Sequence, residues 1–508
     1  MIQHIVVLSK TVTKEHQKSL MLDDMKVVLI DPPNRVASFF RRGTRKRSTR
    51  SPPIGLAYLA AVLRENGAKV RIIDAKSLRM PLKKLSKEIA REKPDIAGIN
   101  VFTCQLRNAM LTAERIKAVS PSTKVVVGGP HIHPQHEEVA QNSSVDVCVR
   151  GEGEITMLHL TNAISNGGDL KKVKGITFKK GKEIIVTPDR PLIKNLDSLP
   201  FPARDLLPNH IYKGLALFGR NTYTLITGSR GCPFKCHFCS VSHFWPIHRR
   251  RSVDNVVNEM EQVYSDFGIR YLRFTDEVLP LDRKWMMDFC KTLVERGLSK
   301  EIAWSCDGHV KVMTREMLKA MSRANCEYVF YGIEFGNQRI LDLSGKGTTL
   351  SQIRKAVKMT KEAGIAIEGN FMIGYPTETK ETIEETIKLA SSLKPDACFF
   401  CVVTPFPGTA LFRYCKENNL LKTERWDEYD YFAPGRSVIK LKNITDKELA
   451  DLYRKAEMCS YFMFAQNAAK TDLFSVMFQD ACTHVSPRSM QPFINASFQL
   501  YENTEEDR

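Results

Sequence analysis

The sequence predicts an α/β protein made of two successive domains and a mainly helical C-terminal region. Two separate series of alternating apolar strands and amphipathic helices are visible, and a proline-rich stretch lies between them. The alternation fades near residue 421. Because 508 residues exceed the size of one ordinary domain, a division of this kind is expected.

The first series predicts a doubly wound parallel sheet over residues 25–190, preceded by an extension over 1–24. Apolar strands separated by amphipathic helices indicate a parallel sheet that is covered on both faces. A hairpin over 175–186, turning near Lys180 and Gly181, is expected to end the series. The expected strands are 26–30, 69–73, 96–100, 124–127 and 145–149, and the expected helices are 54–66, 82–92 and 106–119.

The second series predicts a partial parallel barrel over residues 221–420 that is open on one side. Closely spaced prolines mark a linker over 191–220, since such stretches separate domains. Residues 421–508 are expected to form an aromatic, helical cap and a polar tail. The expected strands are 223–227, 269–275, 302–306, 326–334, 365–373 and 397–403, and the expected helices lie near 253–267, 282–296, 314–324, 350–363 and 379–393.

Three cysteines on one short loop carry the strongest chemical signal in the chain. Cys232, Cys236 and Cys239 have the spacing C-x3-C-x2-C and follow the first barrel strand. Three thiolates on one loop can hold three irons of a 4Fe-4S cluster, which leaves the fourth iron open to a small molecule. The carboxyl end of a barrel strand is also where active sites lie. The alternative is a structural zinc ion that takes His237 or His243 as a fourth ligand.

Composition limits the partners and the compartment. The net charge is +18, with basic runs at 41–47 and 248–251, which suits an anionic substrate or surface. A solvated lysine-rich surface explains the excess more simply, so no stable nucleic-acid partner is expected. Thirteen scattered cysteines favour a reducing cytoplasm over a disulfide framework. No apolar run is long enough to span a membrane, so any membrane contact is expected to be peripheral.

The cysteine loop and the strands after it resemble the radical S-adenosylmethionine superfamily, in which an aromatic residue precedes the last cysteine. Phe238 occupies that position. The resemblance implies a 4Fe-4S cluster and S-adenosylmethionine as cofactors. It also implies a low-potential electron donor of the flavodoxin or ferredoxin type. In this family an electron from the cluster cleaves S-adenosylmethionine, and the resulting 5′-deoxyadenosyl radical abstracts hydrogen from carbon.

The same resemblance assigns roles at the carboxyl ends of the barrel strands. Asp276 and Glu277 stand where the family binds the methionine amino group, although many members have Gly-Gly-Glu there. Glu334 stands where a polar residue reaches the ribose hydroxyls, and Phe238 is expected to help place the nucleoside. Gly374 begins a segment that is similar to the adenine-contacting one. The three loop cysteines are the implied catalytic and metal-binding residues.

The N-terminal domain resembles the Rossmann-like cobalamin-binding domain that precedes the barrel in one branch of this superfamily. The matching segments are Pro53-Ile54-Gly55-Leu56, Gly128-Gly129-Pro130-His131 and Gly151-Glu152-Gly153-Glu154. The motif D-x-H-x-x-G is absent, which implies cobalt without a histidine beneath it. The residues expected to contact cobalamin are Thr103, Gly128, Gly129, His131, Gly151 and Glu152.

The resemblance favours methylation of an unactivated carbon or phosphorus centre in a lipid, a tetrapyrrole or another small molecule. One alternative is oxidative ring formation, as in anaerobic porphyrin-ester cyclases, or the joining of lipid chains with the same cofactors. Another is methylthiolation of transfer RNA, but those enzymes carry three further cysteine ligands, where this chain offers only Cys104 and Cys148. A non-catalytic cobalamin or iron–sulfur sensor is the alternative from a different class. The basic surface and aromatic C-terminal region favour a hydrophobic or anionic substrate.

Overall fold

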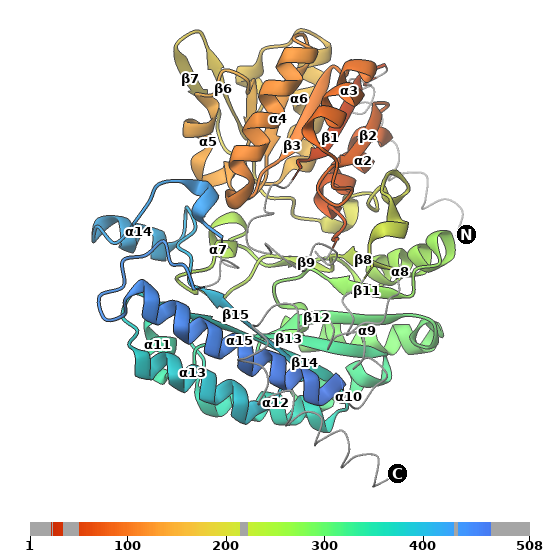
Figure 1. Cartoon of the computed structure of the whole chain (residues 1–508). Coiled ribbons are helices and arrows are strands. Elements are labelled where there is room, and N and C mark those ends of the chain that lie inside the picture. The colour runs from red at the N-terminus through yellow and green to blue at the C-terminus, as the bar shows by residue number, and fades with distance from the viewer. Residues whose placement is uncertain (1–21, 23, 34–49, 214–221, 431–434, 469–508) are drawn as a thin grey trace.

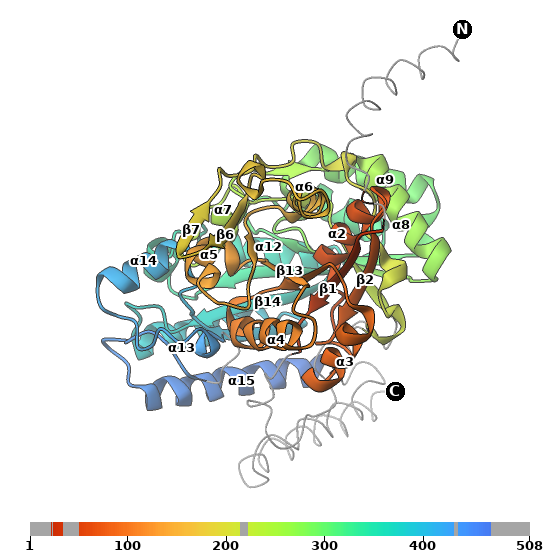
Figure 2. The same cartoon turned by 90° about the horizontal axis from the view of Figure 1, so that it is seen from above.

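The computed structural model describes residues 22, 24–33, 50–213, 222–430 and 435–468. The N-terminal domain lies against the open side of the barrel, and the long helix α15 runs along the barrel's outer surface (Figures 1 and 2). The expectations for most of the N-terminal extension, for the basic run at 41–47 and for the tail after residue 468 fall outside the described residues.

The N-terminal domain contains a seven-stranded sheet in the order β2-β1-β3-β4-β5-β6-β7. Strands β1 to β5 are parallel, and β6 and β7 form an antiparallel hairpin at the edge. This order confirms the predicted doubly wound sheet and its closing hairpin. The strands are β1 Lys26–Asp31, β2 Lys69–Asp74, β3 Ile96–Asn100, β4 Lys124–Gly128, β5 Val147–Val149, β6 Ile176–Lys180 and β7 Glu183–Val186.

Helices cover both faces of this sheet, as the alternating pattern predicts. Helices α2 and α6 pack into one apolar core, and α3, α4 and α5 pack into another on the opposite face. In α3 the buried residues are Leu85 and Ile89, which are four positions apart and share one side of the helix. The helices are α2 Ile54–Glu65, α3 Leu82–Glu92, α4 Leu106–Val119, α5 Ile132–Ala140 and α6 Gly153–Ser165.

The second domain is a six-stranded sheet in the order β15-β14-β13-β12-β11-β8, and every neighbouring pair is parallel. Within the described residues β8 and β15 stay unpaired to each other, which confirms a barrel open on one side. The strands are β8 Tyr223–Ile226, β11 Tyr271–Phe274, β12 Ala303–Gly308, β13 Cys326–Glu334, β14 Ala366–Ile373 and β15 Ala397–Val402.

The barrel helices begin and end where the sequence provides caps. At the start of α8 the Ser252 side chain accepts a hydrogen bond from the Asn255 amide, and Gly268 ends the helix with φ of 63°. Three helices here were not among those expected, namely α11, α14 and the four-residue α7, Val241–Phe244. The helices are α8 Val253–Phe267, α9 Arg283–Glu295, α10 Arg315–Arg323, α11 Gln338–Leu343, α12 Leu350–Glu362, α13 Lys380–Leu393 and α14 Ala410–Glu417.

The proline-rich linker packs against both domains instead of acting as a free spacer. Leu199 and Tyr212 join the apolar core of the N-terminal domain, and Tyr223 and Tyr271 from the barrel join the same core. The buried Tyr212 hydroxyl donates a hydrogen bond to Asp74 at 2.8 Å. A shared core of this kind resists independent movement of the domains.

The C-terminal region contacts both domains. Helix α15, Asp446–Ala468, packs on α13 and β15, in agreement with the expected helical cap. The short 3₁₀ helix η9, Trp426–Glu428, reaches the N-terminal domain, where the Trp426 indole donates a hydrogen bond to Glu138 at 3.0 Å. Among the residues that the structure describes, no helix is long and apolar enough to cross a membrane.

Candidate active site

A short antiparallel ribbon holds the two ends of the cysteine loop together. Strand β9, Ser229–Arg230, pairs with β10, Arg249–Arg250, so residues 231–248 form a loop on this stem. Gly231 follows β9 with φ of 96°, and a Cβ there would lie 2.4 Å from the Ile247 carbonyl oxygen. Only glycine fits this close approach at a positive φ, so the glycine before Cys232 is a structural requirement of the loop.

The three cysteines on the loop carry free, partly buried thiols. Burial raises the pKa of all three, that of Cys236 to about 11, so each thiol stays protonated until a metal displaces the proton. In the described part of the chain, no three His, Cys, Asp or Glu side chains are placed to hold one metal ion. An iron–sulfur cluster does not require such convergence, because each cysteine binds a different iron. The three thiols on this loop therefore fit three irons of such a cluster.

The barrel supports the cysteine loop from behind. The His237 amide donates a hydrogen bond to the Ser344 carbonyl at 2.8 Å, and the His237 Nδ1 lies 2.9 Å from the Leu343 carbonyl. This contact occupies one ring nitrogen of a residue considered as a zinc ligand. The Phe238 ring packs edge-on against the buried Phe335, with centroids 6.5 Å apart. The predicted role of Phe238 at the nucleoside stays a prediction.

A buried ion pair between Lys346 and Glu334 lies beside the cysteines. The Lys346 Nζ is 2.8 Å from the Glu334 Oε1, and the two side chains are 9% and 11% exposed. Burial lowers the pKa of Lys346, but Glu334 and the thiols of Cys236 and Cys239 outweigh this effect and raise it. The lysine is therefore a fixed positive charge near the cluster site. Sequence reasoning found Glu334 but missed Lys346, because no motif marks it.

Asp276 and Glu277 brace the stem of the loop. The buried Asp276 carboxylate accepts hydrogen bonds from the Gly228 amide at 2.8 Å and the Ser229 hydroxyl at 2.6 Å. Glu277 accepts one from the Gly231 amide at 3.1 Å. Burial raises the pKa of Asp276 to about 7 and also raises that of Glu277. Their predicted contact with the methionine amino group stays a prediction.

Gly374 is the first residue after β14 and has φ of 88°. Its amide donates a hydrogen bond to the Glu378 carboxylate at 2.7 Å, and the Tyr375 amide donates another at 2.8 Å. Burial raises the pKa of Glu378 to about 8. This turn fixes the backbone of the segment predicted to contact adenine, and that contact itself stays a prediction.

The barrel interior holds several charged side chains that no sequence motif predicted. Asp307, Phe330 and Glu368 are neighbours across β12, β13 and β14, and their strand neighbours pack outward into the helix-facing core. The Arg273 guanidinium lies 3.9 Å from the Phe330 ring centroid and 3.2 Å from Asp307. Burial raises the pKa of Glu368 to about 7. These side chains are candidates for substrate contact.

The predicted cobalamin residues gather at the carboxyl edge of the first sheet. Gly129 has φ of 114°, and a Cβ there would lie 2.7 Å from the Asn100 side chain, so only glycine fits. The His131 Nδ1 lies 3.2 Å from the Thr103 hydroxyl. The His131 Nε2 and the Gln105 Oε1 are buried without a hydrogen-bond partner in the described structure.

These features fit a polar ligand at that edge, because buried polar atoms normally have partners. Burial lowers the pKa of His131 to about 4, so this histidine is neutral near pH 7. Gly128 ends β4, and Gly151 follows β5 with φ of 67°, so both lie at the same edge. Cobalamin contact by these residues and by Thr103 stays a prediction.

Glu152 has a different environment from the one expected of a cobalamin contact. Its carboxylate accepts hydrogen bonds from Arg230 at 2.8 Å, from Arg249 at 2.9 Å and from the Ile193 amide at 2.7 Å. Both arginines belong to the stem of the cysteine loop. The side chain thus joins the two domains, and its predicted contact with cobalamin stays a prediction.

The basic run at 248–251 is neutralised within the fold. Arg249 pairs with Glu152, Arg250 with Asp282 and Arg251 with Glu259. Since each of these arginines has an acidic partner, the run offers no free basic patch to a polyanion.

Comparisons with known proteins agree with this geometry. A radical SAM superfamily model matches residues 226–390, and a B12-binding domain model matches residues 43–161. An uncharacterised methyltransferase of Pyrococcus horikoshii is 37% identical over 439 residues, covering 86% of this chain and 92% of that protein. The chain belongs to the cobalamin-binding branch of the radical S-adenosylmethionine superfamily. The cofactors of this family are a 4Fe-4S cluster, S-adenosylmethionine and cobalamin.

Two further comparisons bear on this family member. The anaerobic magnesium-protoporphyrin IX monomethyl ester cyclase of Cereibacter sphaeroides is 31% identical over 409 residues, which cover 79% of this chain and 65% of the cyclase. The structure of the methyltransferase TsrM from Kitasatospora setae, with cobalamin and a [4Fe-4S] cluster bound, superposes with a TM-score of 0.67. That match is 18% identical and covers 87% of this chain and 89% of the other, and it supports the two-domain fold.

Proposed function

We propose that the protein methylates an unactivated carbon, or a phosphorus centre, of a small-molecule substrate. The observation that supports this most directly is the joining of the predicted cobalamin loop to the cysteine loop through Glu152, Arg230 and Arg249. When bound, the cluster and S-adenosylmethionine supply a substrate radical, and cobalamin carries the methyl group. Similarity to a methyltransferase at 37% identity favours the same reaction class.

The residues of the chain divide the work between binding and positioning. Cys232, Cys236 and Cys239 hold the cluster, and the Lys346–Glu334 pair places a buried charge pair at its side. Phe238, Asp276, Glu277 and Gly374 complete the proposed S-adenosylmethionine site. The edge formed by Thr103, Gly128, Gly129, His131 and Gly151 receives cobalamin.

The substrate enters from the open side of the barrel in this proposal. Arg273, Asp307 and Glu368 line the interior and suit polar or charged groups of a small molecule. A low-potential flavodoxin or ferredoxin supplies the electron, because a reduced cluster is needed to cleave S-adenosylmethionine. The proposal includes peripheral contact of the protein with an anionic membrane, because the net charge of the chain is +18.

The test is the anaerobically reconstituted protein, with iron and cobalamin counted per chain and the visible spectrum recorded. We expect about four irons and one cobalamin per chain. The variant Cys236→Ala should lose iron and form no 5′-deoxyadenosine from S-adenosylmethionine. The matched control is Cys415→Ala, because Cys415 is buried in the barrel core. This variant should retain iron and should still form 5′-deoxyadenosine. Wild-type 5′-deoxyadenosine formation by Cys236→Ala would refute the cluster assignment.

A second candidate is an oxidative cyclase with the same cofactors, favoured by the 31% identity to the magnesium-protoporphyrin ester cyclase. The mass of the product separates the two. A methyltransferase adds one methylene unit to its substrate, whereas a cyclase removes hydrogen or adds oxygen.

A further inference from the structure

The stem of the cysteine loop brings two arginines side by side. Arg230 on β9 and Arg249 on β10 are direct cross-strand partners. Like charges in this position repel each other, and the stem needs nearby anions to offset the repulsion. The Arg230 guanidinium also lies over the rings of Tyr58, at 5.5 Å, and Trp245, at 5.9 Å.

The anions come from the other domain. Glu152 is the N-cap residue of α6, and Glu154 lies in the first turn of that helix, where the helix dipole favours negative charge. The Arg230 Nη1 donates a hydrogen bond to Glu152 at 2.8 Å, and its Nη2 donates to Glu154 at 2.6 Å. The Arg249 Nη1 donates to Glu152 at 2.9 Å and to the Ile193 carbonyl at 2.7 Å.

Burial makes these contacts stronger than ordinary surface pairs. The four side chains are between 4% and 8% exposed. A buried pair loses far more on removal of one partner than an exposed pair does, because the remaining charge has no water. The two arginines and two glutamates also sum to zero charge, so the charges of this group between the domains compensate one another.

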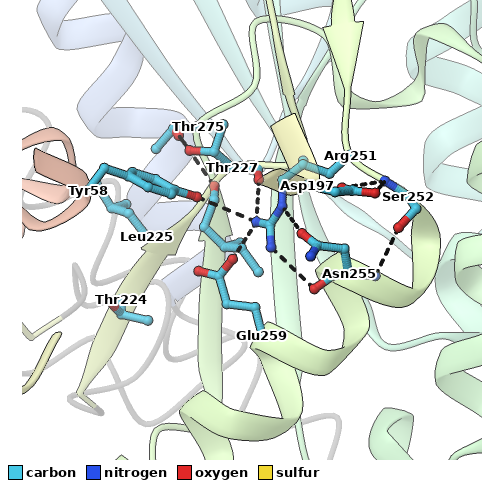
Figure 3. Close-up of polar contacts among 12 residues, drawn as sticks. Tyr58, Asp197, Thr224, Leu225, Thr227, Arg251, Ser252, Asn255, Glu259 and Thr275 are labelled. Atoms are coloured by element: carbon cyan, nitrogen blue, oxygen red, sulfur yellow. Dashed lines mark hydrogen bonds and ion pairs between the residues drawn. The ribbon is translucent and has the colours of Figure 1, made fainter. Parts of the chain in front are cut away.

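The position of this group distinguishes it from another buried network between the domains. In that network Arg251 pairs with Glu259 and lies 3.5 Å from the Tyr58 hydroxyl, as Figure 3 shows. Arg204 of the linker pairs with the same glutamate at 2.6 Å. Those contacts fasten the linker and α8, whereas Arg230 and Arg249 lie at the two ends of the cysteine loop itself.

We infer that Arg230 and Arg249, held by Glu152 and Glu154, are positioning residues that set the cysteine loop at a fixed distance from the cobalamin-binding loop. Glu152 directly follows Gly151 at the predicted cobalamin edge, and Arg230 precedes Cys232 by two positions. A movement of either loop is therefore passed to the other through short, buried contacts. This inference rests on the proposed function, because it concerns the spacing of the two cofactors.

The test compares Arg230→Lys and Glu154→Gln with the wild type, and uses Arg204→Lys as the matched control. Lysine keeps the charge at position 230, but it lacks the two-pronged geometry that reaches both glutamates. Arg204→Lys changes an equally buried arginine between the domains and leaves the stem intact. In each protein, iron and cobalamin are counted and pulsed EPR measures the dipolar coupling between cob(II)alamin and the reduced cluster.

We expect both stem variants to retain iron and cobalamin, and to show a broader and shifted distribution of cobalt-to-cluster distances. The control should match the wild type. Displacement of reacting groups by about 1 Å can cost about a hundredfold, so the stem variants should also form more 5′-deoxyadenosine per methylated product. If Arg230→Lys does not fold, the distance distribution of Glu154→Gln tests the inference by itself.

Three results would overturn the inference. Unchanged distance distributions in a loaded stem variant would refute the positioning role and leave the proposed function standing. Equal broadening in Arg204→Lys would show that any loss of ion pairs between the domains has this effect. Wild-type protein that binds a cluster but no cobalamin would refute the proposed function, and the positioning inference with it.

Discussion

The Lys346–Glu334 ion pair gives a prediction whose size follows from its burial. In Lys346→Met the Glu334 carboxylate loses its partner at 2.8 Å and stays about nine-tenths buried. Breaking a buried pair in this way costs about 3–5 kcal/mol, because an uncompensated charge remains. If Glu334→Gln is added, the remaining charge disappears and most of the loss should be recovered. The pair should therefore show a coupling energy of about 2 kcal/mol or more.

The assay is urea unfolding of the apo protein under anaerobic conditions, for the wild type, both single variants and the double variant. The matched control is Lys284, which pairs with Asp288 at 2.7 Å on the surface, where the lysine side chain is 88% exposed. Lys284→Met should cost less than about 1 kcal/mol. A coupling energy below about 0.5 kcal/mol for Lys346 and Glu334 would refute the reasoning, since independent sites behave in that way.

Three further predictions concern the cluster, the pH dependence of stability and the cobalamin edge. Lys346→Met should make the midpoint potential of the cluster more negative, because a nearby cation favours the added electron; EPR-monitored redox titration measures this, and a positive shift would contradict it. Burial raises the pKa of Glu378 from 4.5 to about 8, so its contribution to stability is present below about pH 4.5 and is lost as the pH rises through about 8. Glu378→Gln should therefore gain stability relative to the wild type over that range, and parallel urea midpoints would contradict this. Gly129→Ala should weaken cobalamin retention because its Cβ would lie 2.7 Å from Asn100, whereas Gly181→Ala, at positive φ but in open space, should not.

Much of the fold could be predicted because its signals are local. Apolar strands and amphipathic helices differ in period, and most residues of the parallel strands are buried. Most predicted bounds therefore agree with the structure to within one or two residues. Gly268 ends α8 as expected because a glycine accepts positive φ. The helices α11 and α14 are six and eight residues long, which is too short for a clear period.

Parts of the site could not be predicted because they depend on residues far apart in the sequence. Arg230 and Glu152 are 78 positions apart, and nothing local indicates that they meet. Lys346 lies in the loop after α11. Its role depends on the ion pair with Glu334, which lies at the end of β13. The cysteine loop was predictable because its three cluster ligands lie within eight residues, so their spacing in the sequence alone indicates a cluster site.

The contact between Trp426 and His131 has a consequence for the order in which the protein is assembled. The two rings lie 5.4 Å apart at the predicted cobalamin edge, and His131 is fully buried. During synthesis the N-terminal domain emerges and folds first, whereas Trp426 belongs to the region after the barrel and emerges much later. Until that residue docks, the edge that carries His131 is open on this side. The edge predicted to receive cobalamin is therefore more accessible in the nascent chain than in the finished protein, in which η9 covers it.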